Sequence, residues 1–537
     1  MAETFPGSRA LLKTDVAVVG AGPVGLMVAN LLGLAGVKVT VLEHNKGLLG
    51  LPRAIAYDAE TLRLFALAGL LGQLAPSLLQ NPPVRYLNER GKVLLAINTP
   101  ASGPLGHSIL GTFYQPDLER ILLGGLSRFP GVKVLFGHEV IGLQQDTSSA
   151  IVKISAKEGQ YSLRAKYAVG CDGGSSRFRD LLGSKLIGST YAQSWLVVDT
   201  IAKGHDLKQI TFYCDPRRPR VEVPAKGDRI RWEFMQLPGE TVEELKSDQG
   251  TRLLVEQTSR YRSVEVERNA VYTFHARVAD RWRNGRGLLA GDAAHLMPPF
   301  AGQGMNGGLK DAANLSWKLA AVLNGAAMEA ILDSYQAERA PAITKMINLS
   351  CRLGSVIMPT SRRVASMRNA IIGMLNMSRR FRDFIARGGI VPPPSITRSQ
   401  LTSSRLDAVI GLMLPQPAVE LNGETMRLDR FQQYHQWMVL GIGEDPAVML
   451  SKRDLDILDR LDASFVCLNG SSTDNRTVTL KCGDPEFAAW VKRYGVRSLL
   501  VRPDRFIADR LDPRRKDLAV LDMFAQACRE TALRKAA

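Results

Sequence analysis

The sequence predicts an α/β protein with a Rossmann-like dinucleotide-binding domain, an inserted sheet domain and a smaller C-terminal domain. Three observations lead to this expectation. A glycine-rich turn follows an apolar, β-branched strand near the N-terminus, strands with interleaved aromatic and basic residues occupy about 185–275, and Pro392-Pro393-Pro394 marks a linker before a last α/β segment. A chain of 537 residues has room for two or three such domains.

The N-terminal turn carries the clearest chemical signal. Val16–Val19 has the composition of a buried strand and runs into a G-x-G-x-x-G motif made of Gly20, Gly22 and Gly25, which a helix follows. Gly20 permits the tight turn, Gly22 lets a pyrophosphate approach the backbone, and Gly25 lets helix and strand pack closely. A second strand ends in Glu43, where a ribose-binding carboxylate is expected. These glycines alone could be structural, but with the strand, the helix and Glu43 they predict an adenine dinucleotide site.

A second glycine-rich stretch predicts the rest of that site. A short strand leads to Gly291-Asp292, and Gly302 and Gly304 open a long helix. Asp292 can hold ribityl hydroxyl groups, and a helix N-terminus beside a flavin ring would stabilise negative charge on the reduced ring. The one other match to G-x-G-x-x-G in the sequence, Gly302–Gly307, follows a proline-containing loop and not a strand, so a nicotinamide has no dinucleotide domain of its own.

The composition of the chain limits the kinds of molecule that the protein is expected to bind. The net charge of +17 invites a nucleic-acid interpretation, but the basic residues are scattered and form no known nucleic-acid module. We expect no nucleic-acid partner and interpret the charge as attraction for an anionic cofactor and substrate, or as an effect on solubility. Six cysteines without C-x-x-C or metal-ligand spacing indicate reduced thiols and no metal. With no secretory signal in view, the expected location is the cytoplasm.

Three motifs in this order resemble the group A flavoprotein aromatic hydroxylases, the family of p-hydroxybenzoate and phenol hydroxylases. They are the Gly20–Gly25 turn with Glu43, Cys171-Asp172-Gly173, and Gly291–His295 followed by Pro298-Pro299 and Gly302-Gln303-Gly304. In segments such as Pro52–Ile55, Cys214-Asp215-Pro216 and Val501–Phe506, the chain is most similar, within that family, to the 3-(3-hydroxyphenyl)propionate hydroxylases. His44 departs from the family pattern, since many relatives have Lys or Arg there.

The resemblance implies domain ranges and roles. It implies an FAD-binding domain in two parts, 1–184 and 281–395, a substrate-binding α+β sheet domain at 185–280, and a thioredoxin-like domain at 405–537. Cys467 and Cys482 lack C-x-x-C spacing, so we expect no redox role for the last domain. The residues expected to bind FAD or to border its ring are Gly20, Gly22, Gly25, Glu43, Arg53, Gln115, Asp172, Asp292, Pro299, Gly302, Gly304, Met305 and Asn306.

The implied activity is hydroxylation of a phenolic acid ortho to its hydroxyl group, with FAD, O2 and NADH or NADPH. Tyr272 and His275 are the candidates for contacting the phenol, with Pro299 beside the flavin. Tyr272 and His275 could instead be ordinary core residues. Arg218 or Arg231 is the candidate partner of a substrate carboxylate, with a surface salt bridge as the alternative for each. A homodimer is the candidate assembly.

Other interpretations stay open at this point. The substrate could be another phenol or a polycyclic aromatic compound, and the protein could be an NAD(P)H oxidase or an escort protein that reuses the fold without catalysis. A halogenase is disfavoured, because the W-x-W-x-I-P signature is absent around all six tryptophans. The basic amphipathic segments within 340–390 could touch a membrane, but we expect them to be a solvated face.

Overall fold

The apolar strand at the N-terminus lies in the middle of a mixed sheet in the computed structural model, which describes residues 12–258, 261, 264–386, 389–512, 514 and 517–527. β1 (Leu12–Val19) pairs in parallel with β2 and β11, and its last four residues are buried. The other strands of this sheet are β2 (Val39–Glu43), β8 (Val132–Phe136), β9 (Glu139–Gln145), β10 (Ala150–Ala156), β11 (Gly159–Gly170), β17 (Arg283–Asn284) and β18 (Gly287–Leu289).

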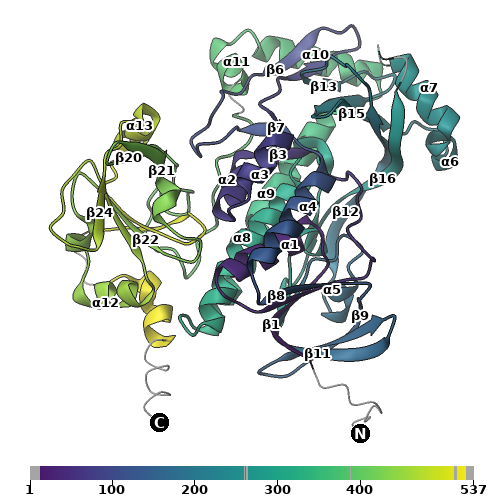
Figure 1. Cartoon of the computed structure of the whole chain (residues 1–537). Coiled ribbons are helices and arrows are strands. Elements are labelled where there is room, and N and C mark those ends of the chain that lie inside the picture. The colour runs from purple at the N-terminus through teal and green to yellow at the C-terminus, as the bar shows by residue number, and fades with distance from the viewer. Residues whose placement is uncertain are drawn as a thin grey trace.

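Helices pack against this sheet, as the expected Rossmann-like topology requires (Figure 1). The first, α1 (Pro23–Leu34), contacts α4 and α8, and nine of its twelve residues are buried. The other helices of this part of the chain are α2 (Ala59–Leu67), α3 (Leu71–Leu74), α4 (Gln115–Gly125), α5 (Arg177–Leu181), α8 (Gly304–Leu323) and α9 (Ser334–Ile357). A small sheet joins β3 (Ala56–Asp58), β4 (Leu79–Gln80) and β7 (Leu110–Thr112). Residues 59–74 form two helices and not one, because Gly69, at φ +70°, separates α2 from α3.

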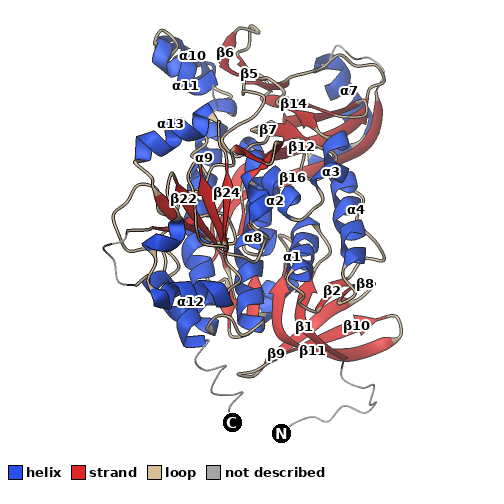
Figure 2. Cartoon of the chain, turned by 60° about the vertical axis from the view of Figure 1, so that its left-hand side comes forward, coloured by secondary structure: helices blue, strands red, loops and turns tan. Residues whose placement is uncertain are grey.

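The inserted domain is a second sheet of eight strands, in the order β19-β16-β12-β15-β14-β13-β5-β6. β5 (Val84–Leu87) and β6 (Val93–Ile97) come from the first expected range, 1–184, and join through a parallel pairing of β5 with β13. The remaining strands are β12 (Leu186–Ile201), β13 (Ile210–Tyr213), β14 (Arg220–Ala225), β15 (Arg229–Met235), β16 (Glu265–Ala279) and β19 (His295–Leu296), and the helices beside the sheet are α6 (Val242–Lys246), α7 (Asp248–Thr258), α10 (Arg362–Leu375) and α11 (Arg379–Ala386). Figure 2 shows α10 and α11 at the top of the molecule beside β5 and β6.

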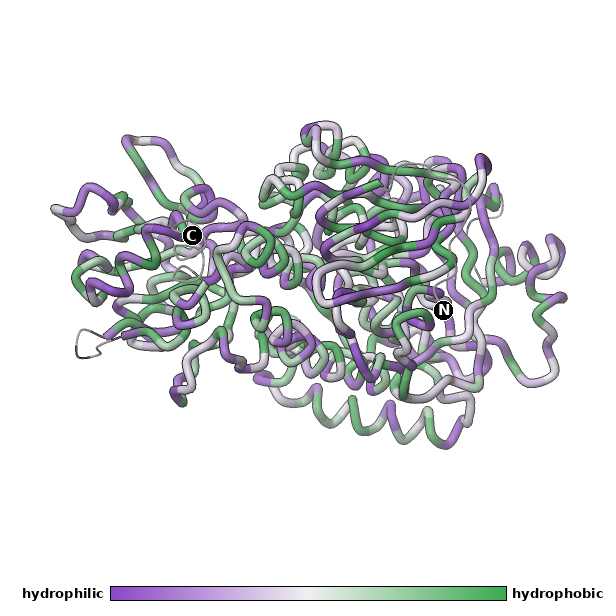
Figure 3. Tube along the Cα trace, turned by 90° about the horizontal axis from the view of Figure 1, so that it is seen from below, coloured by the Kyte–Doolittle hydropathy of each residue, from purple (hydrophilic) through white to green (hydrophobic). Residues whose placement is uncertain are grey.

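The C-terminal domain has a five-stranded sheet of its own, as expected for a thioredoxin-like unit. Three parallel strands, in the order β24-β23-β22, are followed by the antiparallel β25 and β26. Its elements are β20 (Ala418–Leu421), β21 (Glu424–Arg427), β22 (Met438–Ile442), α12 (Lys452–Arg460), β23 (Ser464–Leu468), β24 (Thr477–Leu480), α13 (Pro485–Tyr494), β25 (Ser498–Val501) and β26 (Ile507–Arg510). Seen from below, this domain lies to one side of the rest of the chain (Figure 3).

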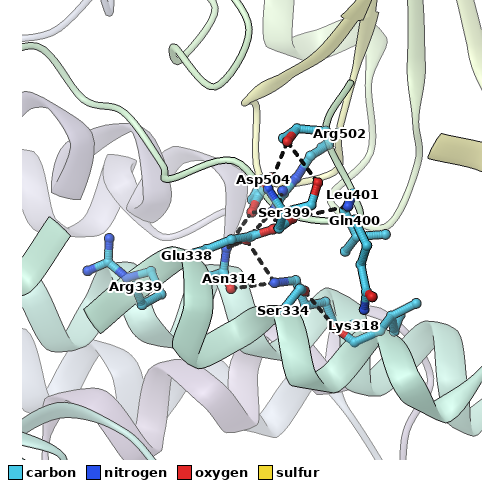
Figure 4. Close-up of polar contacts among 12 residues, drawn as sticks. Asn314, Lys318, Ser334, Glu338, Arg339, Ser399, Gln400, Leu401, Arg502 and Asp504 are labelled. Carbon is cyan, nitrogen blue, oxygen red and sulfur yellow. Dashed lines mark hydrogen bonds and ion pairs between the residues drawn. The ribbon is translucent and has the colours of Figure 1, made fainter. Parts of the chain in front are cut away.

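A buried ionic network joins the C-terminal domain to α8 and α9 (Figure 4). Glu338 of α9 accepts hydrogen bonds from Lys318 Nζ at 2.8 Å and from both terminal nitrogens of Arg502 at 2.7 and 2.8 Å. Asp504 pairs with the same arginine at 2.7 Å, and these four side chains are at most 1% exposed. Burial lowers the pKa of Lys318 to about 8, against the raising effect of Glu338. The domain is therefore fixed to the helix that begins at the second glycine motif.

Candidate functional site

The first glycine motif has the contacts that a pyrophosphate-binding turn requires. Gly20 has φ +103°, and a Cβ there would lie 2.6 Å from Cys171 O. A Cβ at Gly25 would lie 2.0 Å from Gly20 O, so both positions exclude any side chain. Gly22 is different, because a Cβ there would meet no heavy atom within 4 Å. The turn thus leaves open space at the glycine expected to face phosphate, directly before the N-terminus of α1.

Glu43 is held at the end of β2 beside this turn. Its carboxylate accepts hydrogen bonds from Ala21 N at 2.8 Å, Asn45 N at 2.9 Å and Asn45 Nδ2 at 2.7 Å. The residue is 8% exposed, so its position is fixed from three sides. A carboxylate in this place matches the expected partner of a ribose hydroxyl.

Gly291-Asp292 faces the first turn from the second half of the domain. Gly291 has φ +63°, and a Cβ there would lie 2.9 Å from Val24 Cγ2 of α1. A Cβ at Gly308 of α8 would lie 2.9 Å from Gly291 Cα, so this turn and α8 meet backbone to backbone, and both pack against the Val24 side chain of α1. The Asp292 side chain is exposed, yet the protein around it raises its pKa through desolvation, against the lowering effects of His295 and Arg53.

Asp311 of α8 supports this turn from behind. Its carboxylate accepts hydrogen bonds from Gly291 N at 3.1 Å and Arg339 Nε at 2.8 Å, and it lies 2.6 Å from His295 Nε2. Asp311 is fully buried. Burial acts to raise its pKa, but the charges of His295 and Arg339 outweigh it and hold the pKa below its ordinary value. The sequence offered no role for Asp311 or Arg339, since the pairing joins two helices.

Arg53 and Gln115 meet on the other side of the site. Gln115 Oε1 accepts hydrogen bonds from the backbone nitrogens of Arg53 at 3.1 Å and Ala54 at 2.6 Å, and Gln115 Nε2 donates to Glu119 Oε1 at 2.7 Å. Gln115 thus shapes the loop that carries Arg53. The Arg53 side chain is exposed, and its charge partly opposes the desolvation that raises the pKa of Asp292.

Asp172 lies at the end of β11, next to the first glycine turn. It accepts a hydrogen bond from Phe178 N at 2.9 Å and pairs with Ser176, and burial raises its pKa. The hydrogen bonds that the Asp172 carboxylate makes in this structure therefore hold the loop before α5.

Residues 299–306 form the turn into α8. Pro299–Ala301 is a short 3-10 helix, Gly302 adopts the left-handed region at φ +63°, and a Cβ at Gly304 would meet nothing within 4 Å. Met305 is half-buried. Asn306 is fully buried, and its side chain bonds to Thr61 Oγ1 at 2.7 Å and Gly302 O at 2.7 Å. The hydrogen bonds of the Asn306 side chain hold this turn in place. Open space lies beside Gly304.

Comparison with known proteins agrees with this geometry. Residues 13–350 match the family model described as FAD binding domain, and residues 411–526 match the one described as HcaD C-terminal domain. A 3-(3-hydroxy-phenyl)propionate/3-hydroxycinnamic acid hydroxylase of Burkholderia cenocepacia is 37% identical over 97% of this chain and 98% of its own. The protein of the same name from Escherichia coli O81 is 35% identical over 92% and 91%.

The chain belongs to the FAD-binding aromatic hydroxylases. Among solved structures, aklavinone-11 hydroxylase in a ternary complex with FAD and aklavinone is 25% identical, with a TM-score of 0.78 over 96% of this chain and 99% of that one. The residues present in this hydroxylase fit FAD, because a Cβ at Gly22 or Gly304 would meet no heavy atom within 4 Å, Glu43 is held beside the first turn, and Asp292 is exposed.

The hydroxylase does not bring its two candidate phenol contacts together. Tyr272 and His275 both lie on β16, but an odd spacing of three residues puts them on opposite faces of the strand. Tyr272 packs against the hydrophobic cluster that contains Phe300. His275 Nδ1 lies 2.9 Å from Thr190 Oγ1, and burial, followed by the charge of Arg277, lowers its pKa. Only Tyr272 lies on the side of the FAD-binding turn.

Both candidate carboxylate-binding arginines already have protein partners. Arg218 donates to Glu240 Oε2 at 3.0 Å and to Met235 O at 3.0 Å. Arg231 is 3% exposed and donates to Asp199 Oδ1 at 2.7 Å and to Arg53 O at 2.6 Å. A substrate carboxylate would have to displace one of these acceptors. Arg231 instead ties the sheet to the Arg53 loop, which the sequence did not indicate.

An aromatic cluster lies where the sheet meets the turn before α8. Trp195 packs edge-on to Phe300 at a centroid distance of 5.5 Å, and Phe274 lies 5.7 Å from Phe300 and 6.0 Å from Trp195. Trp195 is fully buried, and its Nε1–H has no hydrogen-bond partner among the described residues. Strand alternation on β16 places Phe274 and Tyr272 on one face, and this regularity is the signal that could have found the cluster.

Proposed function

We propose that this hydroxylase adds one hydroxyl group to a phenolic acid of the 3-(3-hydroxyphenyl)propionate type, ortho to the existing hydroxyl group, with NADH or NADPH as the reductant. The observation that carries the proposal is the 37% identity to the Burkholderia cenocepacia hydroxylase, which extends over 97% of this chain. Expected reduced cysteines and a cytoplasmic location belong to the same proposal, supported by five described cysteines that are all unpaired.

FAD, when bound, would supply the redox chemistry that links NAD(P)H oxidation to the use of O2, and the residues of the protein would position the phenol and keep water away. Tyr272 is the candidate for contacting the phenolic hydroxyl, since it lies on the face of β16 that carries Phe274. Trp195, Phe274 and Phe300 supply an apolar wall that excludes water. Glu43, Asp172 and Asp292 are the proposed ligands of the ribose, of FAD with NAD(P)H, and of the ribityl chain.

A polycyclic aromatic substrate is the second candidate. It is favoured by the TM-score of 0.78 to aklavinone-11 hydroxylase and by the absence of an unpaired arginine at positions 218 and 231. A substrate without a carboxylate would leave both of those ion pairs intact, whereas a phenolic acid needs another cation, for which the exposed Arg53 is the candidate.

The test is a panel of phenolic acids and polycyclic phenols, incubated with the purified protein, FAD, NADH or NADPH, and O2. Products are identified by mass and by the position of the new hydroxyl group. We expect a dihydroxylated product from 3-(3-hydroxyphenyl)propionate and tight coupling of NAD(P)H oxidation to that product. Hydrogen peroxide from every compound would identify an oxidase, and protein that binds no FAD would identify an escort.

A further inference from the structure

α10 exposes an apolar stripe to solvent. Val364, Met367, Ile371, Met374 and Leu375 are between 43% and 64% exposed, and their spacing of three and four residues puts them on one face of the helix. We call these five residues the apolar stripe. Neighbouring positions of the same helix, among them Ile372, are buried against the sheet, so the stripe is a second apolar face that nothing in the described chain covers.

The helix is firmly attached, so this exposure is a property of the fold. Arg368 donates to Val356 O at 3.0 Å and to Cys214 O at 2.8 Å. Asn376 Nδ2, at the end of the helix, donates to Leu94 O of β6 at 2.6 Å. These bonds hold α10 with the stripe pointing away from the sheet.

The surface around the stripe is also apolar. Met377 is 82% exposed, Phe384 of α11 is 52% exposed, and Val391 is 47% exposed. Of the 17 large hydrophobic residues that are exposed in the described part of the chain, eight lie between Val364 and Val391. Single exposed apolar residues are ordinary, but such a concentration marks a surface that binds something.

The charges beside the stripe are almost all positive. Arg362 and Arg363 begin α10, and the exposed arginines of α11 are Arg379, Arg380 and Arg382. Asp383 is the one acidic residue between Arg362 and Ala386, and it lies 3.9 Å from Arg379. Five exposed arginines and one aspartate leave a local charge of +4.

The positive charge around the apolar stripe distinguishes between a second copy of this chain and a membrane as the partner that covers it. In a twofold dimer each copy presents the same patch, so the arginines of both copies would face one another across the interface. An anionic bilayer matches both features, because its headgroups attract the arginines while the stripe enters the interfacial region. In place of the solvated face expected from the sequence, we propose that α10 and α11 dock this hydroxylase onto the surface of an anionic phospholipid bilayer.

Docking of this kind is peripheral. None of the helices in the described ranges is long and apolar enough to cross a membrane. An interfacial helix lies in the plane of the membrane, with its apolar face about 5–10 Å deep. The buried side of these two helices, through Ile372 and Ile385, belongs to the hydrophobic cluster that contains Trp195 and Phe300. The bilayer would therefore lie behind the apolar wall of the proposed substrate site.

The test is flotation of the FAD-loaded protein with vesicles of phosphatidylcholine alone, or of phosphatidylcholine and phosphatidylglycerol in equal parts. We expect binding to the anionic vesicles, weakened by salt, and little binding to the neutral ones. The double variant M367E/I371E should lower partitioning about tenfold or more, because two apolar side chains no longer enter the bilayer. R379Q/R380Q should bind less at low salt and show a smaller salt effect.

The matched control is L253E/V448E, which makes the same chemical change at two residues that are 45% and 69% exposed on other elements. The control should float like the unchanged protein, and all variants should keep their FAD content. Absence of binding to anionic vesicles at low salt would overturn the proposal, as would an equal loss in the control. A dimer that M367E/I371E converts to a monomer, seen by light scattering, would assign the stripe to a second copy instead.

Discussion

Replacing Glu338 by glutamine tests how strongly the ionic network of Figure 4 holds the C-terminal domain. Glu338, Asp504, Lys318 and Arg502 carry two negative and two positive charges, so the native group is neutral. The variant leaves one uncompensated positive charge, in a place where these side chains are at most 1% exposed. The glutamine amide would also place an N–H group against the N–H donors of Lys318 and Arg502. Breaking a buried ion pair from one side costs about 3–5 kcal/mol.

The assay is guanidinium unfolding of the FAD-loaded protein, followed by tryptophan fluorescence, since Trp317 and Trp437 lie 5.9 Å apart across this interface. The matched control is Glu424→Gln, whose carboxylate is 68% exposed and 3.8 Å from Arg430. The control should cost at most about 1 kcal/mol.

A double variant separates charge from shape. Adding Lys318→Met to Glu338→Gln makes the buried group neutral again, so the two losses should fall short of additivity by about 1 kcal/mol or more. If Glu338→Gln costs no more than the exposed control, or if the two losses simply add, then the network does not stabilise the interface as a balanced group and the reasoning fails.

Three further predictions concern the site and its surroundings. Asp292→Ala should give colourless or weakly flavinated protein, and full FAD occupancy by absorbance would count against the assigned role. Gly22→Ala should fold but bind FAD less tightly, because its Cβ meets only open space, whereas Gly25→Ala should yield little folded protein, because its Cβ would lie 2.0 Å from Gly20 O; equal yields would contradict this. Burial, with the charges of Arg63 and Arg427, lowers the pKa of His107 to about 4. As the pH falls, His107 is therefore protonated in the unfolded chain at a higher pH than in the folded one. Stability should therefore fall as pH drops from about 6.5 to 4, and His107→Asn should flatten that fall in thermal melts.

The glycine turns were predictable because their chemistry is local. Gly20, Gly22 and Gly25 act within one strand–turn–helix unit, so their spacing identifies both the fold and the ligand. The family assignment and the FAD cofactor, which rest on such motifs, are confirmed, whereas the roles of the individual site residues stay predictions.

The substrate side was less predictable because it is assembled from distant segments. The pairing of Arg231 with Asp199 and with the Arg53 loop joins parts of the chain 32 and 178 residues apart. No local sequence pattern predicts such a contact. An arginine in an alternating strand has the same sequence context whether its side chain binds a substrate or a backbone carbonyl group. The recruitment of β5 and β6 into the inserted sheet went unnoticed for the same reason.

The contact between the backbones of Gly20 and Cys171, and the contact of Gly291 with the Val24 side chain, have a consequence for biosynthesis. A ribosome must finish both glycine segments, and the start of α8 at Gly304, before the walls of the crevice can close on each other. A nascent chain that has exposed only its first three hundred residues holds half of a binding place, so cofactor loading has to wait until translation has passed that point. Cells short of riboflavin would accumulate this protein as a completed but unloaded chain, rather than as one arrested midway.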